Sequence, residues 1–164
     1  MTLAKMKVEF DGFDKVISKL KSLDGDVRKV TEDALRETHS IMTQKAEDAM
    51  ASSKLPAGGK YSKGGTLNSL VRNAQIEWVG DSASVQIGFD IEHGGLASIF
   101  LTHGTPRHQV RNQFGSPKRP DAKQHPGTEK DQALYNVFYG ASVRKQVLAA
   151  QEQIFWNAIR RLER

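Results

Sequence analysis

The 164-residue chain contains no cysteine. Disulfide bonds, catalysis by a thiolate and cysteine-based metal sites are therefore excluded. Long apolar runs are also missing, since no stretch approaches the roughly 18 residues of a membrane span. Residues 1–6 lack the apolar run of roughly 7–15 residues that marks a secretory signal. Because this length suits one domain, composition predicts a soluble, cytoplasmic, single-domain protein without membrane contact.

Positive charge is in excess, with a net charge of +5 and an isoelectric point near 9.5. This balance allows contact with nucleic acid or with an acidic protein surface and proves neither. The excess gathers in a segment between residues 104 and 123, where Asp121 is the single acid. Loops longer than about 12–15 residues inside a domain are usually functional or disordered. The basic residues of this segment are Arg107, Arg111, Lys118, Arg119 and Lys123.

The N-terminal third of the chain has a mainly helical pattern. Alternation in residues 6–10 predicts a short strand, and helical spacing follows from Phe13 to Leu23. Asp24-Gly25-Asp26 is expected to end that helix and to cap the next one. From Val27 to Met50 the apolar residues trace one stripe of a long amphipathic helix, which needs a surface to pack against.

The middle of the chain carries the clearest strand signal. A polar, glycine-rich loop over residues 51–66 precedes it and is expected to place Leu67 and Leu70 at the start of the sheet. Residues 74–78 and 83–89 then alternate between apolar and polar side chains around a turn at 80–82. This pattern predicts an antiparallel hairpin. A two-stranded ribbon is marginal alone, so we expect the long helix to cover its apolar face.

The C-terminal part predicts further helix. Residues 96–101 are apolar and fit either a helical turn or a strand, and a helical pattern resumes at Glu129. Gly140 is expected to kink this region or to separate two helices. The predicted fold class is α+β: a small antiparallel sheet with a β-hairpin packed against a long amphipathic helix, plus a C-terminal helix. It forms a single domain over residues 1–164, with long loops at about 51–66 and 104–128.

The residues that could form a metal, phosphate or catalytic site do not have the spacing that such sites require. His103, His108 and His125 do not have the compact spacing of metal ligands. The glycines around Lys60 and Lys63 follow a helix and do not fit the spacing of a phosphate-binding loop. A triad of Ser69, His103 and Asp90 would lack the Gly-x-Ser-x-Gly nucleophile turn. We therefore expect no enzyme, no cofactor and no metal site.

Two interpretations of the basic segment remain open. In one, a nucleic-acid-binding module uses the basic residues of 104–123 on phosphates while Phe114 stacks on a base. In the other, an arm becomes ordered against a protein neighbour. For contact with further copies or protein partners, the candidate residues are Arg107, His108, Arg111, Phe114, Lys118, Arg119, Lys123, Lys60 and Lys63.

Three short motifs occur in a distinctive order. Pro56 precedes Gly65-Thr66-Leu67-Asn68-Ser69-Leu70, Ser98-Ile99-Phe100-Leu101-Thr102-His103-Gly104-Thr105 follows the hairpin, and His125-Pro126-Gly127-Thr128 precedes the last helical region. This order resembles the neck, or head–tail connector, proteins of long-tailed bacteriophages, including tail-completion proteins. In that family a Thr-Gly-x-Leu-x-x-Ser motif leads into the hairpin and a Glu-Phe-Gly-Thr motif follows it. Here the Gly-Thr order is reversed with a shorter Leu-to-Ser spacing, and Thr102-His103 replaces Glu-Phe.

The resemblance implies a non-enzymatic structural protein of a phage or prophage. Such a protein forms a ring, for example a hexamer or dodecamer, between the portal or head-closure proteins and the tail tube. Its location is the head–tail joint of the virion, reached from the host cytoplasm during assembly. Its partners are further copies of itself and the neighbouring head-closure and tail proteins, with nonspecific contact to exiting DNA as an addition. The residues that carry the resemblance are Leu67, Ser69, Gly104, Thr105, His125, Pro126, Gly127 and Thr128.

Overall fold

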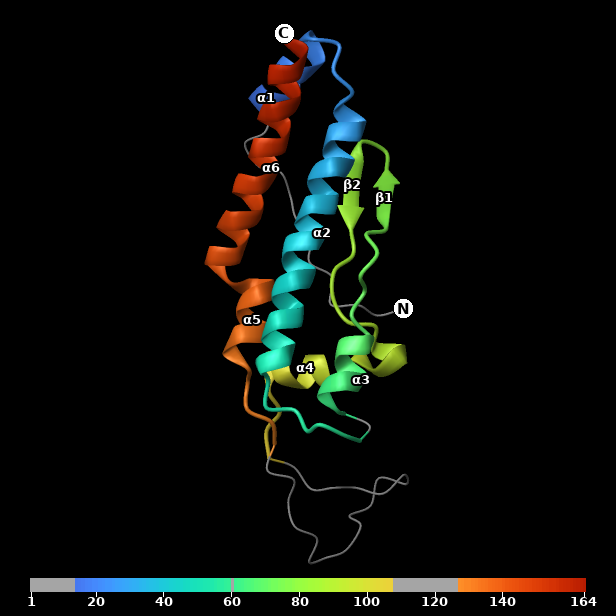
Figure 1. Ribbon diagram of the computed structural model, residues 1–164, viewed down its shortest axis with the longest axis vertical. Coiled ribbons are helices and arrows are strands. Elements are labelled where there is room, and N and C mark those ends of the chain that lie inside the picture. The colour runs from blue at the N-terminus through green and yellow to red at the C-terminus, as the bar shows by residue number, and fades with distance from the viewer. Residues whose placement is uncertain (1–13, 60, 108–126) are drawn as a thin grey trace, which may run out of the picture.

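The computed structural model describes residues 14–59, 61–107 and 127–164. The predicted strand at 6–10 and the central part of the basic segment lie outside these residues. The described elements confirm an α+β fold dominated by helix (Figure 1). In chain order they are α1 (Asp14–Ser22), α2 (Val27–Ser52), α3 (Lys63–Asn68), β1 (Ile76–Val79), β2 (Ser82–Val85), a kinked turn η1 (Ile91–Gly95), α4 (Leu96–His103), α5 (Gln132–Tyr139) and α6 (Ala141–Leu162).

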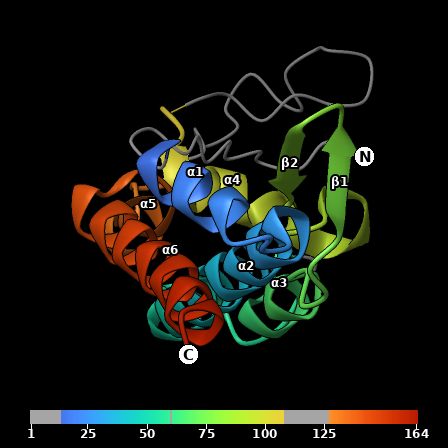
Figure 2. The ribbon, with the colours of Figure 1, turned by 90° about the horizontal axis from the view of Figure 1, so that it is seen from above.

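The long predicted helix is α2, and its start is capped as expected. The Asp26 carboxylate accepts a hydrogen bond from the Lys29 backbone N–H at 3.0 Å, which satisfies one of the free donors at the helix N-terminus. At about 1.5 Å per residue, the 26 residues extend over about 39 Å. In both ribbon views α2 lies beside α6 on one side and the hairpin on the other (Figures 1 and 2).

The hairpin is antiparallel and packs against α2, as predicted. Its strands differ from the predicted ranges, because Ser82 of the predicted turn pairs with Val79 and begins β2, which ends at Val85, whereas Phe89 forms only an isolated bridge with Leu70. Ile76 pairs with Val85 and Trp78 with Ala83, and Gly80 opens the two-residue turn with φ of +60°. The inner face of the hairpin packs against α2 in one core cluster. Trp78 fixes the position, because its indole N–H donates to the Glu32 carboxylate at 3.0 Å. The Arg28 guanidinium also lies 4.5 Å from the centre of the Trp78 ring.

Apolar side chains form two clusters that follow one another along α2. The larger joins α2 to the hairpin, α4, α5 and the first part of α6, with Met42, Ile87 and Leu134 fully buried. The smaller lies where α1 meets α2 and α6, around Leu20 and Phe155. Because α2 packs against the hairpin as well as against α5 and α6, it is the central element of the described structure.

Two sequence predictions are corrected or resolved here. α3 begins at Lys63, inside the loop predicted for 51–66, because Ser62 caps it by accepting from the Gly65 N–H at 3.2 Å. Leu67 therefore lies in a helix and not at the start of a strand. Residues 96–101, which fitted helix or strand, are helical in α4.

The predicted break at Gly140 is confirmed as a separation of two helices. Its backbone is extended, with φ of −77° and ψ of 131°, between α5 and α6. A Cβ at this position would lie 2.4 Å from the Asn136 carbonyl oxygen. The glycine therefore allows α6 to start immediately after α5 in a new direction.

Candidate assembly surface

Two of the sequence motifs meet in space and form a clasp, defined here as Gly104, Thr105, Gly127 and Thr128. The Thr105 N–H donates to the Thr128 carbonyl at 2.8 Å, and the Thr128 N–H donates back to the Thr105 carbonyl at 3.1 Å. The Thr105 hydroxyl oxygen accepts from the same Thr128 N–H at 2.9 Å. An isolated antiparallel bridge thus joins residues that are 23 positions apart.

Both glycines of the clasp have a conformation that other residues rarely adopt. φ is +71° at Gly104 and +86° at Gly127, in the left-handed region. A Cβ on Gly127 would lie 2.3 Å from the Thr105 carbonyl oxygen. A Cβ on Gly104 would lie 3.0 Å from the Thr128 carbonyl oxygen. The Gly-Thr pairs are therefore required by the geometry of the bridge.

The clasp is anchored to two helices. On one side the Gly104 N–H donates to the Phe100 carbonyl at 2.8 Å, which ends α4. On the other side Asp131 donates its N–H to the Leu101 carbonyl at 2.7 Å and caps α5 by accepting from the Leu134 N–H at 3.0 Å. On one side of the clasp the described residues end at Arg107, which is exposed, and on the other they resume at Gly127.

A row of aromatic and cationic side chains lies beside the clasp, and we call it the aromatic patch: His103, Lys130, Tyr135 and Tyr139. The Lys130 ammonium lies 3.0 Å from the centre of the Tyr135 ring. Tyr135 stacks on Tyr139 with ring centres 4.9 Å apart, and His103 follows at 5.9 Å from Tyr139. Tyr139 remains 54% exposed. Exposed, pre-packed tyrosines with a cation are typical of protein contact sites.

The structure also describes the contact candidate Lys63 and the motif residues Leu67 and Ser69, and each makes contacts within the chain. The Lys63 ammonium donates to the Ala51 carbonyl at 2.8 Å, near the C-terminal end of α2. Leu67 packs against the larger core cluster, and the buried Ser69 hydroxyl donates to the Thr66 carbonyl at 2.7 Å. The remaining candidates lie outside the described residues: Lys60, His108, Arg111, Phe114, Lys118, Arg119, Lys123, His125 and Pro126.

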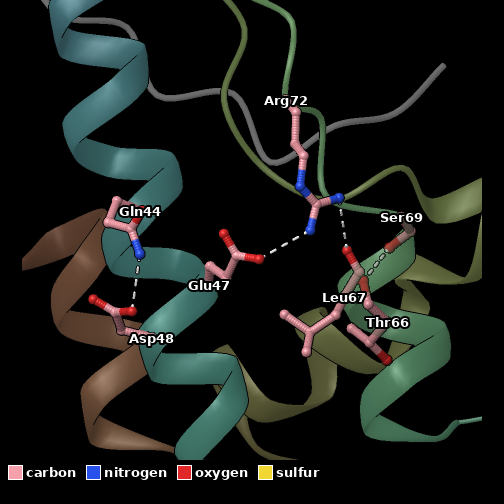
Figure 3. A network of polar contacts seen from close by, with 7 residues as sticks. All are labelled: Gln44, Glu47, Asp48, Thr66, Leu67, Ser69 and Arg72. Atoms are coloured by element: carbon pink, nitrogen blue, oxygen red, sulfur yellow. Dashed lines mark hydrogen bonds and ion pairs between the residues drawn. The ribbon is translucent and has the colours of Figure 1, made fainter.

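A polar network that the sequence did not predict joins α2 to the first motif (Figure 3). The Arg72 guanidinium donates to the Glu47 carboxylate at 3.1 Å and to the Leu67 carbonyl at 3.4 Å. Glu47 and Arg72 are 25 residues apart, so no local spacing marks the pair. Gln44 donates to Asp48 at 3.0 Å on the same helix. Both bonds of Arg72 are partly exposed, so it orients the motif more than it stabilises the fold.

The hypothetical triad does not come together. The Asp90 carboxylate instead contacts the His93 ring at 2.6 Å in the turn before α4. His103 contacts Tyr139, and the Ser69 hydroxyl is engaged by the Thr66 carbonyl. The hydrogen bond that the His93 ring donates to the Asp90 carboxylate raises the pKa of His93, and the same bond lowers the pKa of Asp90. Because His93 is largely exposed, this is a surface pair at a turn.

The described residues contain no group of three or more His, Asp or Glu side chains arranged to hold a metal ion. Nor does any helix among them have the length and apolarity required to cross a membrane. Comparison of the chain with protein-family models, with curated proteins and with solved structures found no match. Function is therefore argued from the residues and their geometry.

Proposed function

We propose that this protein is a non-enzymatic structural component of a phage or prophage head–tail joint. In this role it forms a ring between the portal or head-closure proteins and the tail tube. The ring is built from copies of this chain and contacts the head-closure and tail proteins above and below it. Phage particles are accordingly its final location, with assembly in the host cytoplasm.

The clasp is the observation that carries the proposal. Two of the motifs behind the family resemblance, Gly104-Thr105 and Gly127-Thr128, pair with each other and need their glycines to do so. The chain between them has Val110 and Phe114 as its only large apolar residues and is rich in Lys and Arg. Such a segment has little apolar surface to bury in its own domain and is suited to contact with neighbours.

The order of elements adds support. A long helix, a proline-containing loop, a hairpin, a segment ending in Gly-Thr and a C-terminal helix follow one another in the order of the neck proteins that the chain resembles. The aromatic patch next to the clasp supplies rigid rings of the kind that dominate binding energy at protein interfaces. The proposed contact surface thus consists of the clasp, the exposed Arg107 and the patch.

A co-sedimentation experiment tests the proposal. Purified protein is mixed with DNA-filled heads and with tails, each prepared from a phage of the same host that lacks this gene product. The proposal predicts that the protein sediments with at least one of them and that heads and tails then join. A chain that sediments with neither at micromolar concentration contradicts the proposal. An unrelated basic protein of similar size serves as the control for charge alone.

A further inference from the structure

The tip of the hairpin is an exposed apolar and acidic surface, defined here as Glu77, Val79, Asp81 and Ser82. Val79 is 78% exposed, the highest value among the large apolar side chains that the structure describes. Glu77 and Asp81 are also exposed, and Ser82 lies opposite Val79 in the strand pairing. Within the described residues, neither acid forms an ion pair.

Charge is divided sharply along the sequence on either side of Arg107. Residues 73–106 contain four acids and no Lys or Arg. Residues 107–130 contain six Lys and Arg against two acids. The hairpin tip belongs to the first range, whereas Lys130 of the aromatic patch belongs to the second. Among the described residues, exposed Glu77 and Asp81 place two carboxylates at the tip, and exposed Arg107 and Lys130 place two cations beside the patch. The two surfaces are complementary in charge, and exposed Val79 and Tyr139 offer apolar area on each.

These two surfaces cannot meet within one chain. Figures 1 and 2 both show the hairpin and α5 on opposite sides of α2. Trp78 holds the hairpin against the first turns of α2 through Arg28 and Glu32, whereas α4 and α5 pack together around Leu101 and Asp131. Two different complementary surfaces on opposite sides of a subunit are what a cyclic, heterologous assembly requires.

We infer that the hairpin tip of one copy docks on the aromatic patch of the next copy. Val79 packs on the Tyr135–Tyr139 stack, and the carboxylates of Glu77 and Asp81 face Lys130 and Arg107. This inference rests on the proposed ring and names one of its seams. Repetition of the same contact around an axis closes the ring.

Cysteine pairing tests the seam directly, because the native chain has no cysteine to give a background. One variant carries Ser82→Cys at the tip, and a second carries Asn136→Cys, an exposed position on the Tyr139 side of α5. Ser82 belongs to the tip, but neither change alters the apolar or charged side chains of the proposed contact. The control mixture combines Ser82→Cys with Glu152→Cys, an exposed position on α6. Under mild oxidation, the Ser82→Cys and Asn136→Cys mixture is expected to form a disulfide-linked pair at least about fivefold faster than this control. Equal rates overturn the inference.

A charge exchange gives a second test that does not depend on a cross-link. Asp81→Lys and Lys130→Asp are each expected to weaken self-association about tenfold, measured by sedimentation velocity, because like charges then face each other. Mixing the two variants creates one seam with restored complementarity, so a mixed dimer is expected to recover. Thermal unfolding of each variant checks that the fold is intact. No recovery, with both variants folded, contradicts the seam.

The outcomes separate the seam from the proposed function. If the wild-type protein forms rings but neither test supports a contact between the tip and the patch, the proposed interface is contradicted and the proposed ring is not. If the protein neither self-associates nor sediments with heads or tails, both are contradicted. If the protein binds tails but never self-associates, the proposed interface and the ring are contradicted, whereas a role at the head–tail joint is not.

Discussion

The backbones of Thr105 and Thr128 pair through two hydrogen bonds of 2.8 and 3.1 Å, although 23 positions separate the residues. This bridge fixes the two ends of the basic segment at one point on the body, between the end of α4 and the start of α5. The two motifs therefore lie side by side in the fold. The bridge thereby links the sequence motifs to the proposed assembly role.

Gly127→Ala is predicted to open the clasp. The added Cβ would lie 2.3 Å from the Thr105 carbonyl oxygen, and φ is +86°. Gly59→Ala is the matched control, because φ there is +97° but no atom lies within 4 Å of the added Cβ. Both changes carry the cost of about 1–2 kcal/mol for a left-handed alanine. In urea unfolding, Gly127→Ala is expected to lower the free energy of unfolding by about 1 kcal/mol or more beyond the loss in Gly59→Ala.

Gly127→Ala and Gly59→Ala are also expected to differ in their binding to heads and tails. Gly127→Ala is predicted to lose sedimentation with heads and tails under conditions where it remains folded, whereas Gly59→Ala keeps it. If both variants assemble like the wild type, the clasp has no part in assembly.

The buried Gln151 predicts an unusual response to substitution. Its amide N–H donates to the Thr38 hydroxyl at 2.7 Å, but its carbonyl oxygen has no partner among the described residues. Gln151→Met removes this oxygen at similar volume, so we expect stability within about 1 kcal/mol of wild type. Gln151→Ala leaves a cavity and is expected to cost about 2–3 kcal/mol. Urea midpoints distinguish the two, and a loss above about 2 kcal/mol for the Met variant would show that the oxygen is satisfied.

His93 and His39 are expected to have opposite effects on how the free energy of unfolding changes with pH near 6.5. The hydrogen bond that His93 donates to the Asp90 carboxylate raises the pKa of His93. This pair therefore adds stability that is present below pH 6.5 and lost as the pH rises through the folded pKa. Burial lowers the pKa of His39, so the stability that depends on its neutral form is lost as the pH falls below 6.5. Urea midpoints from pH 5 to 8 are therefore expected to fall more steeply toward acid in His93→Gln and less steeply in His39→Gln. Slopes equal to wild type in both variants contradict these assignments.

DNA binding separates the proposed function from the nucleic-acid-binding alternative. A module that uses the basic segment on phosphates should bind duplex DNA at about 50 mM salt and lose affinity by orders of magnitude by about 200 mM. A protein-contact role predicts that head and tail binding survives 200 mM salt. Fluorescence anisotropy with a labelled duplex, beside co-sedimentation at both salt concentrations, makes the comparison. DNA binding without any head or tail binding favours the alternative.

Local patterns predicted the elements whose signals are local. Alternation over residues 74–78 and 83–89 predicts the hairpin because side chains of a strand alternate between faces, and the observed strands are Ile76–Val79 and Ser82–Val85. The stripe along α2 and the Asp26 cap likewise depend on neighbours within four residues. The range 96–101 stayed open between helix and strand because a short apolar run fits both.

The candidate site depended on contacts that no local pattern encodes. His103 and Tyr139 are adjacent only because α4 packs against α5. Lys63 was predicted as a partner contact from its charge, yet its ammonium binds the Ala51 carbonyl across the intervening loop. The motif order predicted that Gly104-Thr105 and Gly127-Thr128 matter, and the structure shows that they pair.

The central claim is that copies of this chain form a closed ring at a head–tail joint. The most direct measurement is electron microscopy of the purified protein, with and without tails, combined with its mass from light scattering. The account predicts ring-shaped particles of one defined mass, either free at high concentration or at the end of the tail. A strict monomer at every concentration that also leaves tails and heads bare would contradict it.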